Sequence, residues 1–195
     1  IWTCIRFTLT GGLISLFISL VLYQNTASFE ATSGEWFAAF IEEPSKLIAL
    51  LLLTKNNKKY PYILNGLLLG AAVGTGFSVF ESAGYAFSLG SNNIDSIVQI
   101  IQLRGVFSPI SHIAWTAISG AALWDARRGN QVNFLLILKK EFYIPFSIVI
   151  FCHSIWNTGS RLPINLHLVL CGVISWFIIN KLIKRGVLEI ANEKK

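Results

Sequence analysis

The chain has few charged side chains. Asp, Glu, Lys and Arg together make up 13% of its 195 residues, whereas they supply about 25% of a typical soluble domain. Hydrophobic residues make up 53%, and the mean hydropathy is +0.59. This shortage of charge excludes an ordinary soluble globular domain and predicts an integral membrane protein embedded in the lipid bilayer.

Methionine is absent and cysteine is scarce. Because no methionine stands at position 1, we expect the chain to begin inside a longer gene product. Cys4, Cys152 and Cys171 lie in apolar segments without paired spacing, which excludes a disulfide framework and a thiolate metal site. The sequence contains no soluble domain, repeat or low-complexity linker. We therefore expect residues 1–195 to form a single membrane domain.

Apolar segments long enough to cross a bilayer recur along the chain. A transmembrane helix needs about 20 apolar residues, and six segments approach that length: about 4–23, 36–53, 61–87, 107–124, 142–156 and 166–183. Between the third and the fourth, residues 94–103 carry apolar side chains at helical spacing, which is typical of an interfacial helix. The sequence thus predicts an all-α polytopic bundle of about six transmembrane helices.

The basic residues follow the loops of a membrane topology. The chain carries 16 Lys and Arg against 10 Asp and Glu, a net charge of +6. Most of the basic residues fall at 55–59, 127–140 and 181–195, whereas Arg104 and Arg161 are expected on the opposite side. The positive-inside rule then places both termini in the cytoplasm. Since the positive charge follows this topology, we expect no nucleic-acid partner.

Four predicted spans carry polar residues that a membrane segment rarely contains, because each charge costs about 2.5–3.5 kcal/mol at mid-bilayer on insertion scales. With alternating span directions, these residues all reach one depth, toward the extracytoplasmic side. Pro44 is tolerated near a helix start, so we expect the acidic cluster at a first helical turn. The polar residues are Glu42, Glu43 and Lys46 in the second span, Glu81 in the third, His112 in the fourth, and His153 and Asn157 in the fifth. Their common depth predicts one shared site.

Carboxylates and imidazoles side by side support a limited set of reactions. An acid can serve as a general base, and two histidines can stabilise an oxyanion or bind a metal. The HExxH pair of zincins is absent, but Glu81, His112 and His153 from three helices suit an open zinc site. A structural alternative stays open, in which Glu81 and Lys46 form only a buried ion pair and the histidines join helices.

Four motifs occur in order across the second to the fifth predicted span. They are Glu42-Glu43-x-x-Lys46, Phe77-x-x-x-Glu81, His112 after a serine, and His153-x-x-x-Asn157. This arrangement, over about residues 36–159, resembles the PrsW family of intramembrane proteases. That family looks related to the CAAX prenyl endopeptidases and to the multi-span scaffold subunit of γ-secretase. The CAAX group has EExxxR and FxxxH where this chain has EExxK and FxxxE, so the PrsW pattern fits better.

The resemblance implies an endopeptidase that cleaves membrane-anchored proteins, such as an anti-sigma factor, on the extracytoplasmic side of a bacterial plasma membrane. The implied roles are water activation by Glu43 or Glu42 with the other as its partner, transition-state stabilisation by His112 and His153, and support from Lys46, Phe77, Glu81 and Asn157. These assignments are expectations that depend on the motifs.

Cofactor use is left open by the resemblance. The PrsW family was long classed as metalloproteases, whereas the CAAX relatives look like glutamate-type enzymes. Because Lys46 lies beside the acids and opposes a bound cation, we favour no cofactor and expect no tightly held zinc, although zinc is possible. In that case Glu81, His112 and His153 would be its ligands.

A hypothesis from a different functional class also stays open. The chain could be a non-catalytic membrane scaffold or a transporter-like protein, in which the same polar residues would lock helices together or relay protons. A scaffold needs a stable partner, whereas a protease needs the basic carboxylate, so mutation of that carboxylate separates the two.

Overall fold

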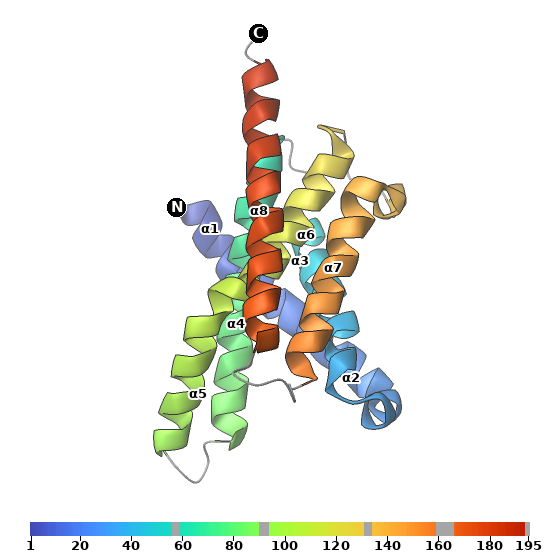
Figure 1. Cartoon of the computed structure of the whole chain (residues 1–195). Coiled ribbons are helices and arrows are strands. Elements are labelled where there is room, and N and C mark those ends of the chain that lie inside the picture. The colour runs from blue at the N-terminus through green and yellow to red at the C-terminus, as the bar shows by residue number, and fades with distance from the viewer. Residues whose placement is uncertain (56–58, 90–93, 131–133, 159–165, 194–195) are drawn as a thin grey trace.

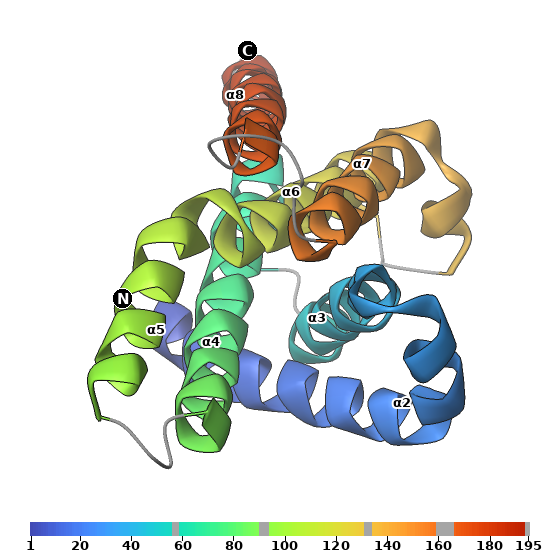
Figure 2. The same ribbon diagram turned by 60° about the horizontal axis from the view of Figure 1, so that its bottom comes forward.

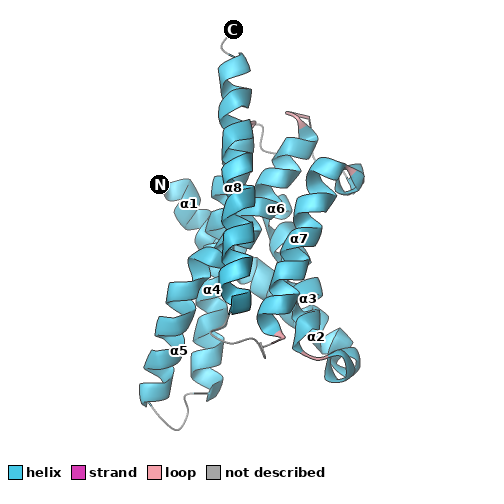
Figure 3. Ribbon diagram, viewed as in Figure 1, coloured by secondary structure: helices cyan, strands magenta, loops and turns pink. Residues whose placement is uncertain are grey.

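The computed structural model describes residues 1–55, 59–89, 94–130, 134–158 and 166–193. Within these ranges the regular structure is helical and no strand occurs (Figures 1 and 3). The predicted all-α polytopic membrane bundle is therefore confirmed. Arg161, which the topology prediction placed opposite the other basic residues, lies outside the described residues.

The described helical elements follow one another in a fixed chain order. The elements are α1 (Trp2–Arg6), a π-helical segment η1 (Phe7–Gly11), α2 (Gly12–Ser33), η2 (Glu35–Phe37), α3 (Ala38–Thr54), α4 (Ile63–Leu89), α5 (Ile94–Phe107), η3 (Ser108–Ile110), α6 (His112–Arg127), η4 (Phe134–Leu138), α7 (Lys140–Asn157) and α8 (Leu166–Glu193).

Helix α6 lies at the centre of the bundle and is buried along nearly its whole length. One core joins it to α3 and α4 through Leu50, Val73 and Trp124. A second core joins it to α7 and α8 through Val149 and Leu182. Figure 2 shows α2 running across α4 and α3 on the side away from α8. This arrangement brings α3, α4, α6 and α7 together around one interior region.

Among the residues that the structure describes, four segments are long and apolar enough to cross a membrane: Trp2–Phe29, Ile63–Ser88, Ile94–Arg127 and Leu166–Glu193. They match the first, third, fourth and sixth predicted spans. The second and fifth predicted spans coincide with α3 and α7, which have only 17 and 18 residues and contain the buried polar groups. The number of membrane crossings stays a prediction.

Two local expectations differ from the structure. The fourth predicted span begins at 107, but helix α6 begins at His112, after a 3₁₀ turn that contains Pro109. Pro44 does not mark a first turn, because α3 already begins at Ala38. The second difference arises because proline, which lacks an N–H group, was used to locate a helix boundary. The position of α5 relative to the bilayer interface stays a prediction.

Glycines let α4 approach α6 closely. A Cβ atom at Gly70 would lie 2.3 Å from the carbonyl oxygen of Thr116, and one at Gly66 would lie 2.6 Å from that of Gly120. Small residues of this kind allow membrane helices to pack backbone against backbone. Because α4 and α6 both carry predicted site residues, this contact also sets the dimensions of the site.

We expect Gly70→Ala to lower the thermal stability of the protein in detergent. The added methyl group must push α6 away, and overpacking of this kind costs about 1–3 kcal/mol. The matched control is Gly84→Ala in the same helix, where an added Cβ meets nothing within 4 Å. Melting curves followed by tryptophan fluorescence measure both variants, and equal melting temperatures would contradict the close α4–α6 packing.

Candidate active site

Helix α3 supplies three neighbouring polar side chains. Glu42, Glu43 and Lys46 are all buried, and the Lys46 side chain is fully enclosed. Glu43 and Lys46 are three residues apart and therefore face the same side of the helix. Lys46 Nζ lies 2.5 Å from Glu43 Oε1, so the two groups form a buried ion pair.

Lys46 also contacts the histidine at the start of α6. Its Nζ lies 3.0 Å from His112 Nδ1. Since an ammonium group can only donate hydrogen bonds, His112 Nδ1 accepts this one. The proton of the neutral ring is then on Nε2, which lies 3.2 Å from Glu81 Oε2. His112 thus links the lysine on α3 to the acid on α4.

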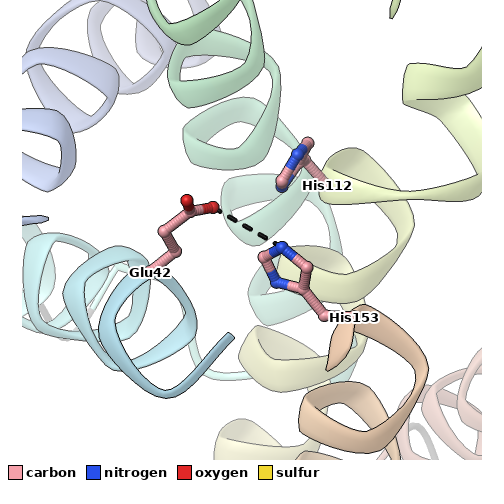
Figure 4. A group of neighbouring side chains, drawn as sticks. All are labelled: Glu42, His112 and His153. Carbon is pink, nitrogen blue, oxygen red and sulfur yellow. Dashed lines mark ion pairs between the residues drawn. The ribbon is translucent and has the colours of Figure 1, made fainter. Parts of the chain in front are cut away.

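The second histidine approaches the acids from α7. His153 Nδ1 lies 2.7 Å from Glu43 Oε1 and donates to this carboxylate, while its Nε2 faces Glu42 Oε2 at 3.6 Å. Trp115 stacks on the imidazole with ring centroids 4.6 Å apart. Figure 4 shows Glu42, His112 and His153 pointing toward one another from three helices.

Glu42 has one partnered and one unpartnered oxygen. Its Oε1 accepts a hydrogen bond of 2.8 Å from the hydroxyl of Tyr23 on α2. Its Oε2 is buried without a hydrogen-bond partner among the described residues. A buried carboxylate oxygen of this kind requires a donor. A water molecule beside Glu42 Oε2 and His153 Nε2 would supply this donor.

Arg104 on α5 completes the cluster. Its guanidinium pairs with Glu81, and its Nε donates to Ser82 Oγ at 2.8 Å. The three carboxylates of the cluster thus face two fixed cations, Lys46 and Arg104. With neutral histidines and ionised acids, one negative charge remains uncompensated, which suits a site that takes up a proton or a cation.

A cavity of about 280 Å³ reaches the cluster beside His112. Arg104 and Phe107 of α5 line one wall, and Trp156 of α7 lines another. The buried network therefore has space next to it through which water can approach.

The structure joins most of the predicted residues in one network. Phe77 supports it, because its ring lies 4.7 Å from Lys46 Nζ and 5.5 Å from the His112 ring. Asn157 stands apart and donates to the backbone oxygen of Glu35 at 3.4 Å. The network consists of Glu42, Glu43, Lys46, Glu81, His112 and His153.

Sequence reasoning missed two members of this site, Tyr23 and Arg104. Tyr23 lies at the end of the first predicted span, at the same predicted depth as Glu42, so the depth argument would have included it. Arg104 was noticed only as a basic residue on the side opposite most of the others. Because Arg104 is isolated from the other basic residues, its position could have indicated that it pairs with a buried acid, here Glu81.

The residues of the site suit a metal ion by type. One possible ligand atom from each of Glu42, His112 and His153 lies within 4.8 Å of the others, and two imidazoles with a carboxylate form a known catalytic zinc set. Glu43 accepts a hydrogen bond from His153 Nδ1. A carboxylate in this position can orient a metal-bound histidine. His112, however, can offer a lone pair to a metal ion only if Nδ1 gives up the hydrogen bond from Lys46, or if Nε2 gives up its proton and its contact with Glu81.

This ligand set differs from the one expected from the sequence. Glu42 takes the place of Glu81, because Glu81 is engaged by Arg104 and by His112. The residue types of a zinc site are therefore brought together, with a different carboxylate from the predicted one.

A family model described as PrsW family intramembrane metalloprotease matches residues 1–182. Searches of curated proteins and of solved structures gave no significant match. The matched range runs from α1 into α8 and includes every residue of the buried network. The chain that folds around these carboxylates and imidazoles therefore belongs to the PrsW family of intramembrane proteases.

Proposed function

We propose that this intramembrane protease hydrolyses the peptide bond with a water molecule activated by Glu42. The observation that carries the proposal is the buried Oε2 of Glu42, which has no partner among the described residues and faces His153 Nε2 at 3.6 Å. Both atoms are acceptors when the histidine is neutral and donates through Nδ1. A water molecule that lies beside both atoms can donate one proton to Glu42 and the other to His153.

Glu43 is less suited to be the base, although the sequence favoured it. Its Oε2 is also buried without a partner among the described residues, but its Oε1 already accepts hydrogen bonds from Lys46 and from His153. A carboxylate held by an ammonium group is a weaker proton acceptor. We therefore assign Glu43 to the orientation of His153 and Glu42 to the proton transfer.

The steps follow from these positions. The water oxygen attacks the carbonyl carbon as its proton passes to Glu42, which yields a tetrahedral oxyanion. The Nε2–H of His112 and the ammonium of Lys46 are the nearby donors that stabilise the negative oxygen. Protonated Glu42 then gives its proton to the leaving amine nitrogen as the C–N bond breaks. Glu42 thereby returns to its basic form.

Zinc held by Glu42, His112 and His153 would polarise the carbonyl and acidify the water. We favour a glutamate-type enzyme, because Lys46 already supplies a positive charge 3.0 Å from His112 Nδ1. The same lysine opposes a second cation at this place.

We expect the purified protein to keep its cleavage activity after dialysis against a chelator and to hold well under one equivalent of zinc. Elemental analysis measures the metal in the unmodified protein and in His112→Ala and His153→Ala. His167→Ala is the control, because this buried histidine lies outside the network. One equivalent of zinc that departs with either site variant, but not with the control, would refute the glutamate-type mechanism.

The active site is proposed to lie in the extracytoplasmic half of the membrane, with both termini cytoplasmic. This sidedness is supported by the distribution of basic residues under the positive-inside rule. The proposed substrates are membrane-anchored proteins, of which an anti-sigma factor is one example.

We expect reconstituted protein to cleave a single-span test polypeptide within its membrane segment, in the half away from the enzyme's termini. Mass spectrometry of the fragments locates the cut, and protease protection of terminal tags determines the orientation. If the folded protein cleaves none of a panel of such polypeptides, the result would favour the hypothesis of a non-catalytic scaffold. Cleavage in the same half as the termini would contradict only the sidedness.

A further inference from the structure

Helix α2 packs closely against the bundle through a face of small residues. A Cβ atom at Gly12 would lie 2.5 Å from the backbone carbonyl carbon of Gly76 on α4. Ser15 and Ser19 follow at the spacing that keeps side chains on one helix face, and both are buried. Tyr23 stands one turn further along the same face. The close packing of the small residues thus brings a long polar side chain of α2 within reach of the neighbouring helix α3.

Tyr23 and His153 face different oxygens of the Glu42 carboxylate. The hydroxyl of Tyr23 donates to Glu42 Oε1 at 2.8 Å. Glu42 Oε2 has no hydrogen-bond partner among the described residues and faces His153 Nε2 at 3.6 Å. Figure 4 shows one carboxylate oxygen turned toward His153 and the other turned away. One oxygen is therefore held by α2, and the other is left for the attacking water.

A carboxylate needs a fixed partner to keep this orientation. The last torsion of a glutamate side chain is broad and roughly two-fold, so an unheld carboxylate can turn about it. The two cations of the cluster, Lys46 and Arg104, are paired with its other two acids. Among the described residues, the hydrogen bond that fixes Glu42 therefore comes from Tyr23. Its hydroxyl acts from a rigid ring and adds no charge to the site.

We infer that Tyr23 is a positioning residue for hydrolysis, whose hydroxyl holds Oε1 of Glu42 so that Oε2 stays directed at the attacking water. The inference rests on the proposed protease function and makes α2 a part of the active site. Tyr23 transfers no proton and touches no reacting atom. Loss of its hydroxyl should therefore slow the chemical step and leave substrate binding unchanged.

Tyr23→Phe removes the hydroxyl and keeps the ring. With a single-span polypeptide in vesicles we expect kcat to fall about 10- to 100-fold, because a displacement of about 1 Å at a catalytic site can cost about 10²-fold. KM should stay within about twofold, since the interaction lost is not one that binds substrate. Tyr60→Phe is the matched control, because the Tyr60 hydroxyl donates to Thr3 on α1 at 3.4 Å.

Combination with Glu42→Gln tests whether the hydroxyl acts through the carboxylate. If it does, removal of the base also removes the benefit of holding it, so the effects of the two substitutions are not additive. We expect Glu42→Gln and Glu42→Gln/Tyr23→Phe to show equal residual rates in single-turnover reactions followed by mass spectrometry. A second loss in the double variant, as large as the loss in Tyr23→Phe alone, would show that Tyr23 acts on another group.

A replacement donor at position 23 tests the hydrogen bond itself. p-Aminophenylalanine keeps the ring and places an N–H donor where the O–H group was. We expect it to recover most of the kcat that Tyr23→Phe loses. Rates are expressed per folded protein, with the folded fraction taken from melting curves, so that a change in stability is not counted as a change in kcat.

The outcomes separate this inference from the protease proposal. Cleavage with an unchanged kcat for Tyr23→Phe, with a change in KM alone, or with an equal loss in Tyr60→Phe overturns the positioning role and leaves the protease proposal standing. A p-aminophenylalanine variant as slow as Tyr23→Phe does the same. If the unmodified protein cleaves no test polypeptide, the protease proposal is refuted and the role of Tyr23 is refuted with it.

Discussion

Glu42→Gln is expected to abolish cleavage and leave the fold intact. Glutamine keeps the shape of the side chain and still accepts the hydrogen bond from Tyr23, which lies 2.8 Å from Oε1. It cannot take a proton from water, and loss of a general base typically lowers the rate by about 10²–10⁴-fold. Initial rates of cleavage of a single-span polypeptide in vesicles, together with melting curves, measure both properties.

Glu43→Gln is the comparison that makes this result informative. It leaves Lys46 buried without its carboxylate, so we expect a lower melting temperature and a weaker hold on His153. Glu42→Gln should therefore be stable and inactive, whereas Glu43→Gln should be destabilised with partial activity. Full activity of Glu42→Gln beside an inactive, stable Glu43→Gln would exchange the two roles. Full activity of both variants would reject the carboxylate mechanism.

The fold could be predicted from the sequence to the extent that apolar runs determine helices. The segments around Trp2–Phe29, Ile63–Ser88 and Leu166–Glu193 emerge from hydropathy because burial in lipid requires such runs. Helix ends were predicted less well, because hydrogen bonding within the helix continues past the apolar run. Helix α8, for example, continues to Glu193, whereas the prediction ended at 183.

The residues of the site were predictable because charge is rare in membrane helices and every occurrence is conspicuous. Their pairing was not predictable, since it depends on how far α3 is rotated against α6 and α7. That rotation places Lys46 against His112 and leaves Glu42, not Glu81, beside His153. Asn157 shows the converse, because it shares the predicted depth of the cluster but faces the turn at Glu35.

The ion pair of Lys46 and Glu43 is expected to have the largest effect on stability. Lys46→Met keeps much of the side-chain length but leaves the Glu43 carboxylate buried without its ammonium partner. Removal of one partner of a buried pair costs about 3–5 kcal/mol, whereas apolar replacement of both is often neutral. The double variant Glu43→Gln/Lys46→Met leaves no unpaired buried charge, so it should be more stable than Lys46→Met alone. Thermal unfolding in detergent measures all members of this double-mutant cycle.

The control for this cycle is Arg128→Met at the end of α6. Arg128 is largely exposed and lies 3.6 Å from Glu141, and exposed pairs of this kind contribute little. We expect its melting temperature to be unchanged. A Lys46→Met variant as stable as this control would show that the buried pair does not support the fold. If that variant were also inactive, Lys46 would act in the reaction itself, as a donor to the oxyanion beside His112, and the double variant would stay inactive.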